Sequence, residues 1–234
     1  MNYPEVYTEE ERDAVEHHIS TRFGEYKSVL HELVSPDIHV DICVIEPTEE
    51  RNHYTLVTMG MGAHRMNVPK QLAEYKLERA ELMICLPPDW ILSRGDLAVS
   101  YDDEDNKDKN SPNNEIWYWP LRWLKILARL PKENNTWLGF GHTIPNGPEA
   151  EPFAENTGLG CIMLIQPLQF EEEAEICQMP DGGQVAFYQM FPIYADEMYY
   201  KLENDAEHLL EKFAYDPEME NVLVLDVNRK SVMR

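Results

Sequence analysis

PLRWLKILARLP, residues 120–131, is a largely apolar stretch bounded by two prolines. Proline fits the first turn of a helix, where its missing N–H is not needed, and it stops a helix that has already begun. The spacing therefore predicts a helix over residues 121–130. Because apolar side chains such as Leu124 occur nearly all around this helix, we expect most of its surface to be buried against a sheet.

Short apolar runs of strand length are the source of that sheet. Residues 27–34 and 38–45 flank Ser35-Pro36-Asp37, a turn sequence, and so favour a β-hairpin. Further runs bring the expected number of strands to about seven: 54–61, 81–86, 159–165, 184–191 and 221–227. Several runs are apolar on both faces, as strands covered from both sides are.

Two more helices are predicted at the ends of the chain. Thr8 and Glu11 form a capping box, and apolar residues then recur every four positions at Val15, Ile19 and Phe23. A helix over residues 195–213 is expected to present one apolar stripe. That stripe comprises Met198, Leu202, Ala206, Leu209 and Phe213. The expected fold is therefore α+β, an irregular mixed sheet of about seven strands packed with three or more helices.

No Gly/Ser-rich linker divides the chain into two cores. A boundary near residue 110 would separate the helix over 121–130 from the strands that it needs. We therefore expect one domain over residues 1–234, with its core over about 25–228. A chain of this length buries about three quarters of its unfolded surface, so it requires neither a disulfide nor a structural metal.

The charge of the chain is far from balanced. Forty-three acids and twenty bases give a formal net charge of −23 at pH 7. Nucleic acids and anionic membranes bind through Lys and Arg, so this balance argues against both as partners. The densest acidic point is Glu171-Glu172-Glu173-Ala174-Glu175. Such a surface either keeps a protein soluble or steers a basic partner toward it.

The four cysteines predict a reduced protein. Cys43, Cys85, Cys161 and Cys177 are far apart and form no C-x-x-C motif. Three of them lie within apolar runs, where free cysteine behaves as a small core hydrophobe. Neither a signal peptide nor an apolar run of membrane-spanning length is recognisable, so a cytoplasmic location is expected.

Motifs for cofactors and metals are incomplete. The glycines of Gly139-Phe-Gly141-His142 do not extend to a phosphate-binding pattern, and prolines rather than a helix follow them. The acidic stretch 102–114 lacks the glycine and the glutamate that an EF-hand calcium loop requires. We expect no cofactor and no metal site.

Candidates for nucleophilic catalysis are equally weak. His39, Asp41 and Cys43 share one face of a predicted strand, but successive side chains on such a face are about 7 Å apart, too far for an easy relay. His142 lies in a Gly/Pro-rich loop, a common place for binding residues, but no partner for catalysis is identifiable. The chain is therefore expected not to be an enzyme.

Five segments of the sequence carry a family pattern. They are HVDICVIEP (39–47), YTLVTMGMGAHRMNVP (54–69), ELMICLPPDW (81–90), WYWPLRWLKILARLP (117–131) and GFGHTIPNG (139–147). Together they resemble the suppressor of fused (SUFU-like) family in its short, single-domain bacterial form. The segments occur in family order and cover about residues 25–200.

The resemblance implies a SUFU-like fold and a non-enzymatic, protein-binding role. Animal members sequester a transcription factor by clamping a short peptide of it between two domains, and this sequence resembles only the N-terminal of those two. Short bacterial members serve largely as immunity proteins in polymorphic toxin systems. The family supplies no catalytic residue.

The leading hypothesis is an immunity-type inhibitor that neutralises a basic toxin. Its candidate binding residues are His142 and Asn146 of the loop 139–147 and the four glutamates of the acidic point, Glu171, Glu172, Glu173 and Glu175. The alternatives are a general regulatory protein-interaction domain and an uncharacterised hydrolase that uses His142 with an acid.

Overall fold

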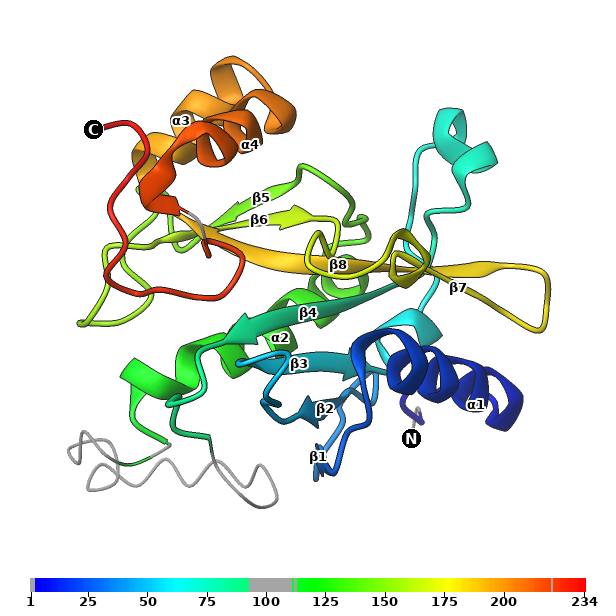
Figure 1. The fold of residues 1–234 in the computed structure, drawn as a ribbon. Coiled ribbons are helices and arrows are strands. Elements are labelled where there is room, and N and C mark those ends of the chain that lie inside the picture. The colour runs from blue at the N-terminus through cyan, green and yellow to red at the C-terminus, as the bar shows by residue number, and fades with distance from the viewer. Residues whose placement is uncertain (1–2, 93–110, 112, 220) are drawn as a thin grey trace.

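A mixed sheet runs through the molecule (Figure 1). The computed structural model describes residues 3–92, 111, 113–219 and 221–234; most of the polar stretch 102–114 lies outside them. Within the described residues the strand order is β1-β2-β3-β4-β8-β6-β5, with β7 beside β8. The strands are β1 Ser28–Leu30, β2 Asp41–Ile45, β3 Tyr54–Met59, β4 Ala80–Leu86, β5 Thr143–Pro145, β6 Cys161–Ile165, β7 Ile176–Gln178 and β8 Gln184–Ile193.

The long strand β8 joins the two halves of the sheet. It pairs in parallel with β4, from Ala80↔Ala186 to Met83↔Gln189, whereas every other pairing between the named strands is antiparallel. Beyond that point β8 continues beside β6, with Met163 opposite Phe191. The sheet is mixed and is covered by several helices, which confirms the expected α+β fold.

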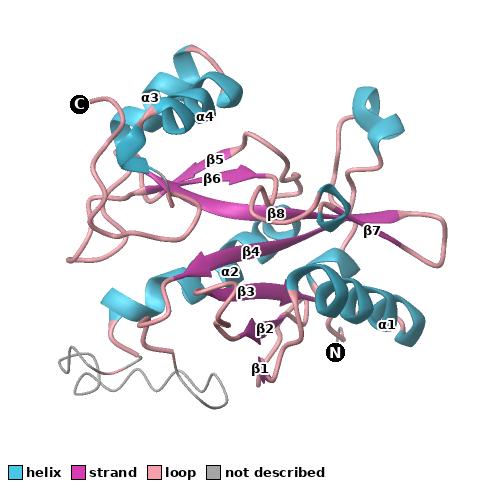
Figure 2. Ribbon diagram, viewed as in Figure 1, coloured by secondary structure: helices cyan, strands magenta, loops and turns pink. Residues whose placement is uncertain are grey.

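The helices cover the two faces of the sheet unequally (Figure 2). One face packs against α2, Glu115–Glu133. The other face is shared by α1, Glu9–His18, and by the pair α3, Ala195–Glu203, and α4, Ala206–Tyr215. Strand alternation produces this division, because even-numbered residues of β8 face α2 while odd-numbered ones face the other helices.

Helix α2 is buried as predicted but is longer than the predicted 121–130. It begins after Asn114, whose side chain accepts the Ile116 N–H at 3.1 Å, and it ends at Glu133. Pro120 therefore lies inside the helix, where it cannot donate to the carbonyl one turn earlier. The Asn156 side chain reaches that Ile116 carbonyl at 3.5 Å, which explains how the helix tolerates the proline.

Helix α1 confirms the predicted capping box. The Thr8 side chain accepts the Glu11 N–H at 3.3 Å, and the Glu11 carboxylate accepts the Thr8 N–H at 3.0 Å. The helix continues as a π-helical turn over Ile19–Phe23, and Val15, Ile19 and Phe23 are fully buried. The four-residue apolar spacing in the sequence therefore identified the face that packs on the sheet.

The predicted hairpin is present, but its strands are shorter than expected. Strands β1 and β2 pair from Ser28↔Val44 to Leu30↔Ile42, so residues 31–40 form a long connection instead of a tight turn at 35–37. Carboxylates replace the strand ladder there. Glu32 N–H donates to Asp41 Oδ1 at 2.9 Å, and Val40 N–H donates to Glu32 Oε2 at 3.3 Å.

The single helix predicted over 195–213 is wrong, because the chain breaks between α3 and α4. Asn204 leaves the helical conformation at φ −115° and ψ −101°, and Asp205 accepts the His208 N–H at 2.8 Å as the N-cap of α4. Four members of the predicted stripe are buried, but Leu202 is 60% exposed. Asp205 is a typical N-cap residue and so marks the start of a new helix, but the apolar spacing of four residues continues across it and hides the break.

The strand predicted over 221–227 is also wrong. This segment, which we call the strap, is an irregular stretch that lies where β4 and β8 separate. Leu225 contributes to the core under α2, Val224 packs on the core under α1, and Val222 packs on the core under α3 and α4. The alternating apolar residues of the strap thus fill the space between three core clusters, and the strap does not pair with a strand.

All four cysteines are free and buried. Burial is predicted for the three that lie in apolar runs, whereas Cys177, expected to be more reactive because it follows the glutamate cluster, is buried as well. Burial raises the pKa of the Cys85 and Cys161 thiols to about 12 and that of Cys177 to about 11, and it raises the pKa of Cys43 well above its usual value. We expect native protein at pH 8 to react slowly with a thiol reagent and urea-unfolded protein to react at four sites. Three or four fast-reacting thiols in the native state would contradict this placement.

Of the helices in the described part of the chain, none is both long enough and apolar enough to cross a membrane.

Candidate functional site

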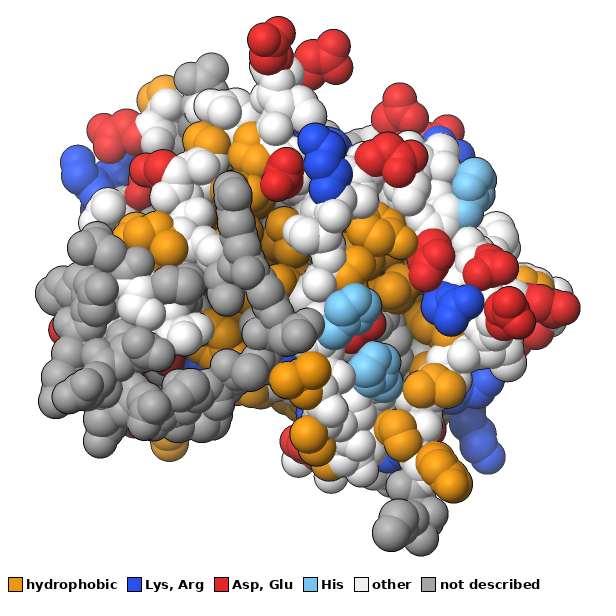
Figure 3. Space-filling model, turned by 90° about the horizontal axis from the view of Figure 1, so that it is seen from below, with side chains coloured by type: hydrophobic (Ala, Val, Ile, Leu, Met, Phe, Trp, Pro, Cys, Tyr) orange, Lys and Arg blue, Asp and Glu red, His pale blue; other side chains and the backbone are white. Residues whose placement is uncertain are grey.

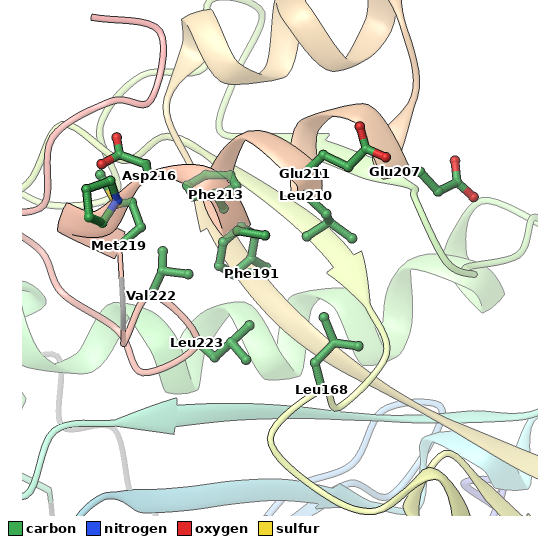
Figure 4. A pocket seen from close by; sticks show the side chains of 12 residues that line it. Leu168, Phe191, Glu207, Leu210, Glu211, Phe213, Asp216, Met219, Val222 and Leu223 are labelled. Atoms are coloured by element: carbon green, nitrogen blue, oxygen red, sulfur yellow. The ribbon is translucent and has the colours of Figure 1, made fainter.

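An open groove of about 720 Å³ lies between α4, the end of β8 and the strap (Figure 4). Its volume falls within the range of roughly 300–1,000 Å³ that ligand sites occupy. Its lining is mostly apolar. The lining residues are Leu168, Phe191, Glu207, Leu210, Glu211, Phe213, Ala214, Asp216, Pro217, Met219, Val222 and Leu223.

Strand β8, helix α4 and the connection that carries Leu168 position these side chains. Phe191 of β8 and Phe213 of α4 form the floor, with their rings edge to face at 4.9 Å between centroids. Leu210 stands on the same helix one turn before Ala214 and is half-buried, so it forms one wall. Leu168, which is 52% exposed, lies across the groove from α4 (Figure 4). Exposed apolar surface of this kind, rimmed by polar groups, is typical of interaction sites.

The opposite wall, residues 217–223, is held by side-chain hydrogen bonds. The Leu223 carbonyl accepts from Gln189 Nε2 at 2.6 Å and from Gln169 Nε2 at 3.1 Å. Leu225 N–H donates to the Cys85 carbonyl at 2.9 Å. These bonds fix an irregular segment against the sheet, so the groove exists before any partner binds.

A buried ion pair anchors the chain that follows the strap. The two terminal nitrogens of the Arg229 guanidinium, NH1 and NH2, each donate to one carboxylate oxygen of Glu197 at 2.7 Å. Glu197 is fully buried at the start of α3. Arg229 NH2 also donates to the Pro192 carbonyl at 2.9 Å. Its guanidinium lies 4.9 Å from the Tyr194 ring centroid, so the pair is enclosed by aromatic surface as well.

The rim of the groove is acidic. Glu207 and Glu211 stand on consecutive turns of α4, both exposed, and no ion pair joins either of them to a cation within the described residues. Asp216 is different, because Arg234 NH2 lies 3.1 Å from it. An apolar trough with exposed carboxylates on one side favours a ligand that combines apolar side chains with positive charge.

His142, a sequence-predicted site residue, does not line this groove. Its ring packs edge to face on Trp137 with 4.3 Å between centroids. Burial lowers the pKa of His142, and the nearby Lys201 lowers it further. A neutral, half-buried imidazole packed edge to face on tryptophan forms part of the packing beside α3.

The two histidines on this side of the molecule should titrate in opposite directions from the ordinary value near 6.5. His142 should have its midpoint below 6.5 because burial disfavours the charged ring. His208 should have its midpoint above 6.5 because Asp205 hydrogen-bonds to the protonated ring. Histidine side-chain NMR over pH 4.5–8.5 measures both, and the reverse order would contradict the placement of His142.

Asn146 also serves the local structure. Its side-chain amide donates to the Glu151 carbonyl at 2.8 Å and to the Pro152 carbonyl at 3.1 Å, which closes the loop after β5. The predicted loop 139–147 contains a strand that the sequence did not indicate: β5 pairs with β6 and forms one edge of the sheet. The sequence-predicted loop 139–147 therefore lies at a sheet edge.

The acidic point at 171–175 lies against α1. Glu172–Ala174 form a short 3₁₀ turn, and the Ala174 carbonyl accepts His18 Nε2–H at 3.1 Å. Glu171 is exposed, with Arg22 NH1 3.8 Å away, whereas burial and then the charge of Glu172 raise the pKa of Glu175. Ala174 packs in the core under α1, and the groove lies over Phe191 in the core under α3 and α4, so the acidic point and the groove belong to the same side of the sheet.

The β1 edge carries a second group of polar side chains; Figure 3 views the molecule from that side and shows histidines beside exposed hydrophobic side chains. His39 Nε2 lies 3.2 Å from Asp41 Oδ1, and His39 Nδ1 lies 2.7 Å from Ser35 Oγ. The expectation that side chains on this strand face lie too far apart is therefore wrong for His39 and Asp41, and the sequence of contacts Ser35–His39–Asp41 superficially matches a hydrolase relay. However, Ser35 Oγ–H donates its single proton to Glu32 Oε2 at 2.7 Å and so does not donate it to His39, as a nucleophile activated by that histidine would.

Cys43, the third residue of that predicted strand face, is fully buried and carries a strongly raised pKa, so it is not a thiolate nucleophile. Among the described residues, no group of three or more His, Cys, Asp and Glu side chains is arranged to hold a metal ion. The groove is therefore the strongest candidate for function in the described part of the chain.

Comparison with known proteins gives the family. The family model of the suppressor of fused protein (SUFU) matches residues 36–230, most of the chain. The chain belongs to the suppressor of fused family. No curated protein matches it. The resemblance carried by the five sequence segments is thus confirmed at the level of the family.

Three solved structures show how far the SUFU fold extends. A suppressor of fused homologue from Neisseria gonorrhoeae and the structure of a Sufu–Fu complex each match with a TM-score of 0.63 at 16% identity. The matches cover 95% of this chain and 96% of the first, and 99% of this chain and 94% of the second. Drosophila Suppressor of Fused matches with a TM-score of 0.52 at 16% identity, over 83% of this chain and 42% of that one.

Sequence reasoning missed the groove because its walls come from distant segments. Leu210 and Leu223 look like ordinary core residues in the sequence, and the strap resembles a strand. One usable signal was present: Glu207, Leu210, Glu211 and Ala214 form a second, mixed face on α4, beside the buried Leu209 and Phe213.

Proposed function

We propose that this SUFU-family chain is a non-enzymatic protein-binding domain whose groove captures a basic protein partner. The observation that carries the proposal is the apolar groove with the exposed carboxylates of Glu207 and Glu211 on its rim. The formal net charge of −23 adds a long-range attraction for a cationic protein. A relative of similar fold is seen in a Sufu–Fu complex, which supports protein binding as the use of this fold.

We further propose that the captured partner is a toxin of a bacterial polymorphic toxin system and that the chain is its immunity-type inhibitor. Inhibition needs only that the bound domain cover the surface through which the toxin acts. A toxin that acts on nucleic acid needs a cationic surface, and an acidic inhibitor competes for that surface. The alternative, a regulatory protein-interaction domain, shares the binding step and differs in what the partner does.

A variant in the groove tests the binding step. Tagged wild-type protein captures its partner from the native host, and the partner is identified, purified and titrated against two variants. Leu210→Asp places a charge on the groove wall and should weaken binding at least tenfold. Leu202→Asp places the same charge on α3, where Leu202 is 60% exposed outside the groove, and should leave binding unchanged. Equal affinities would exclude the groove.

Expression of the captured partner tests the inhibitor role. A toxin should stop growth of a host that lacks this chain, and co-expression of wild-type protein, but not of Leu210→Asp, should restore growth. A partner that leaves growth unaffected would contradict the toxin assignment and would leave protein binding intact.

The acidic point at 171–175 should govern the rate of association. Changing Glu171, Glu172, Glu173 and Glu175 to lysine should slow association tenfold or more, within the roughly 10–10³ range that electrostatic steering supplies. The effect should fall with salt, since the Debye length shrinks from about 10 Å at 0.1 M to about 3 Å at 1 M. Stopped-flow mixing with the purified partner measures both.

A matched control separates location from net charge. It makes the same charge change at four other exposed glutamates: Glu49, Glu50, Glu133 and Glu149. Steering toward one face predicts a smaller effect for this control. Identical association rates for wild type and the 171–175 variant at low salt would remove the acidic point from the mechanism.

A further inference from the structure

We infer that the segment which occupies the groove is an amphipathic helix, with apolar side chains on one face and Lys or Arg spaced four residues apart beside them. The inference rests on the proposed function, because it specifies the partner of the same site. Three features of the groove select a helix over an extended strand: its floor, its polar groups and the geometry of its α4 wall.

The floor of the groove is the face of a sheet. Phe191 belongs to β8, which lies between β4 and β6 in the strand order. Open strand edges belong to β1 and β5, the two ends of that order, and to β7, which among the described strands pairs with β8 alone; none of the three lines the groove. A peptide that binds by adding a strand requires the unpaired N–H and C=O groups of an edge, and the groove does not supply such an edge.

The polar groups in the groove cannot replace those backbone partners. Among the lining side chains, the hydrogen-bonding ones are the carboxylates Glu207, Glu211 and Asp216, which accept and do not donate. The Leu223 carbonyl already accepts from two glutamine amides. An extended peptide would therefore leave its own carbonyls unsatisfied over an apolar floor, whereas a helix satisfies them internally.

The α4 wall has the shape that another helix packs against. Glu207, Leu210, Glu211 and Ala214 recur at i, i+3, i+4 and i+7 and so form one ridge along the helix. A second helix that lies beside this ridge would insert its apolar residues between Leu210 and Leu168. Figure 4 shows these two side chains on opposite sides of the trough.

The rim sets the charge and the spacing of the occupant. Glu207 and Glu211 are one helical turn apart, a rise of about 6 Å. Lys or Arg residues four apart on the occupant repeat with the same rise, so each can approach one carboxylate. An occupant with Asp or Glu at those positions would place like charges together and is selected against.

Synthetic peptides test the inference directly. The probe is a fluorescent amphipathic peptide of about 18 residues, long enough to be helical, with Leu at i, i+3, i+4 and i+7 and with Lys four apart beside them. One comparison peptide carries proline at its centre, and another replaces each Lys with Glu. Fluorescence anisotropy with the full-length chain should show binding of the parent peptide, and both comparison peptides should bind at least tenfold more weakly.

Protein variants place the bound peptide in the groove. Glu207→Lys with Glu211→Lys alters two exposed residues, so folding is not at risk, and it should weaken the parent peptide at least tenfold. Leu210→Asp should do the same, provided that its thermal unfolding shows a folded protein, and Leu202→Asp should not. Equal binding to wild type and to the rim variant would overturn the inference.

Two results separate this inference from the proposed function. If the proline peptide binds as tightly as the parent, or if no helical peptide binds, the helix is wrong. Capture of a protein that Leu210→Asp fails to bind would still support the groove as a docking site. If Leu210→Asp captures that protein unchanged, the proposed function fails as well.

Discussion

Replacing Leu124 with aspartate should leave the chain without a stable folded state at 25 °C. Leu124 is fully buried in the middle of α2, within the cluster between that helix and the sheet. An unpaired charge in such a place costs several kcal/mol, a large part of the roughly 5–15 kcal/mol that stabilises a typical domain. We expect the variant to accumulate as insoluble protein or to lack a cooperative thermal transition.

A matched control lies two residues along the same helix. Ile126 is 41% exposed, so Ile126→Asp should cost about 1 kcal/mol or less and give soluble protein. Leu124→Ala, which removes apolar contacts without adding charge, should lower the free energy of unfolding by about 2–5 kcal/mol. Parent-like melting of Leu124→Asp would show that α2 does not pack on the sheet as described.

Breaking the Glu197–Arg229 pair should produce the second large effect. Arg229→Met leaves the Glu197 carboxylate buried without its cation, which typically costs about 3–5 kcal/mol. The methionine retains an apolar stem beside Tyr194, so the loss reports mainly on the charge. Urea unfolding at pH 7 should therefore give a markedly lower midpoint with little change in the slope.

The neighbouring lysine is the control for this pair. Lys230 Nζ lies 3.6 Å from Glu218, and both side chains are more than 60% exposed. Surface pairs of this kind contribute about 0–1 kcal/mol, so Lys230→Met should be nearly neutral. Equal effects of the two variants would mean that Arg229 does not hold the end of the chain against α3.

Elements whose signals are local could be predicted from the sequence. The capping box at Thr8 fixed the start of α1, and the apolar run after Pro120 identified the buried helix. The break at Asp205 was missed because a capping residue inside an otherwise periodic stripe leaves the apolar spacing intact. The strap was read as a strand because alternation cannot distinguish a paired segment from one that fills a seam.

The site depends on information that the sequence holds only at long range. Leu168, Phe191, Leu210 and Leu223 meet because β8, α4 and the strap cross at one place, and no spacing in the chain reveals that crossing. His142 is a histidine in a glycine-rich loop and so looks like a binding residue, yet its ring packs edge to face on Trp137. The residue types in a loop indicate which side chains are exposed there. A groove forms only where separate elements pack together, so the sequence of one segment does not reveal it.

The parallel pairing of β4 with β8 has a consequence for synthesis on the ribosome. Strand β4 ends at Leu86 and β8 begins at Gln184, so about a hundred residues must emerge before the two can meet. At roughly 5–20 residues per second, the completed β4 waits for some 5–20 s with one edge uncovered. A nascent chain paused within that interval exposes an apolar strand edge, the moment at which it depends most on chaperones.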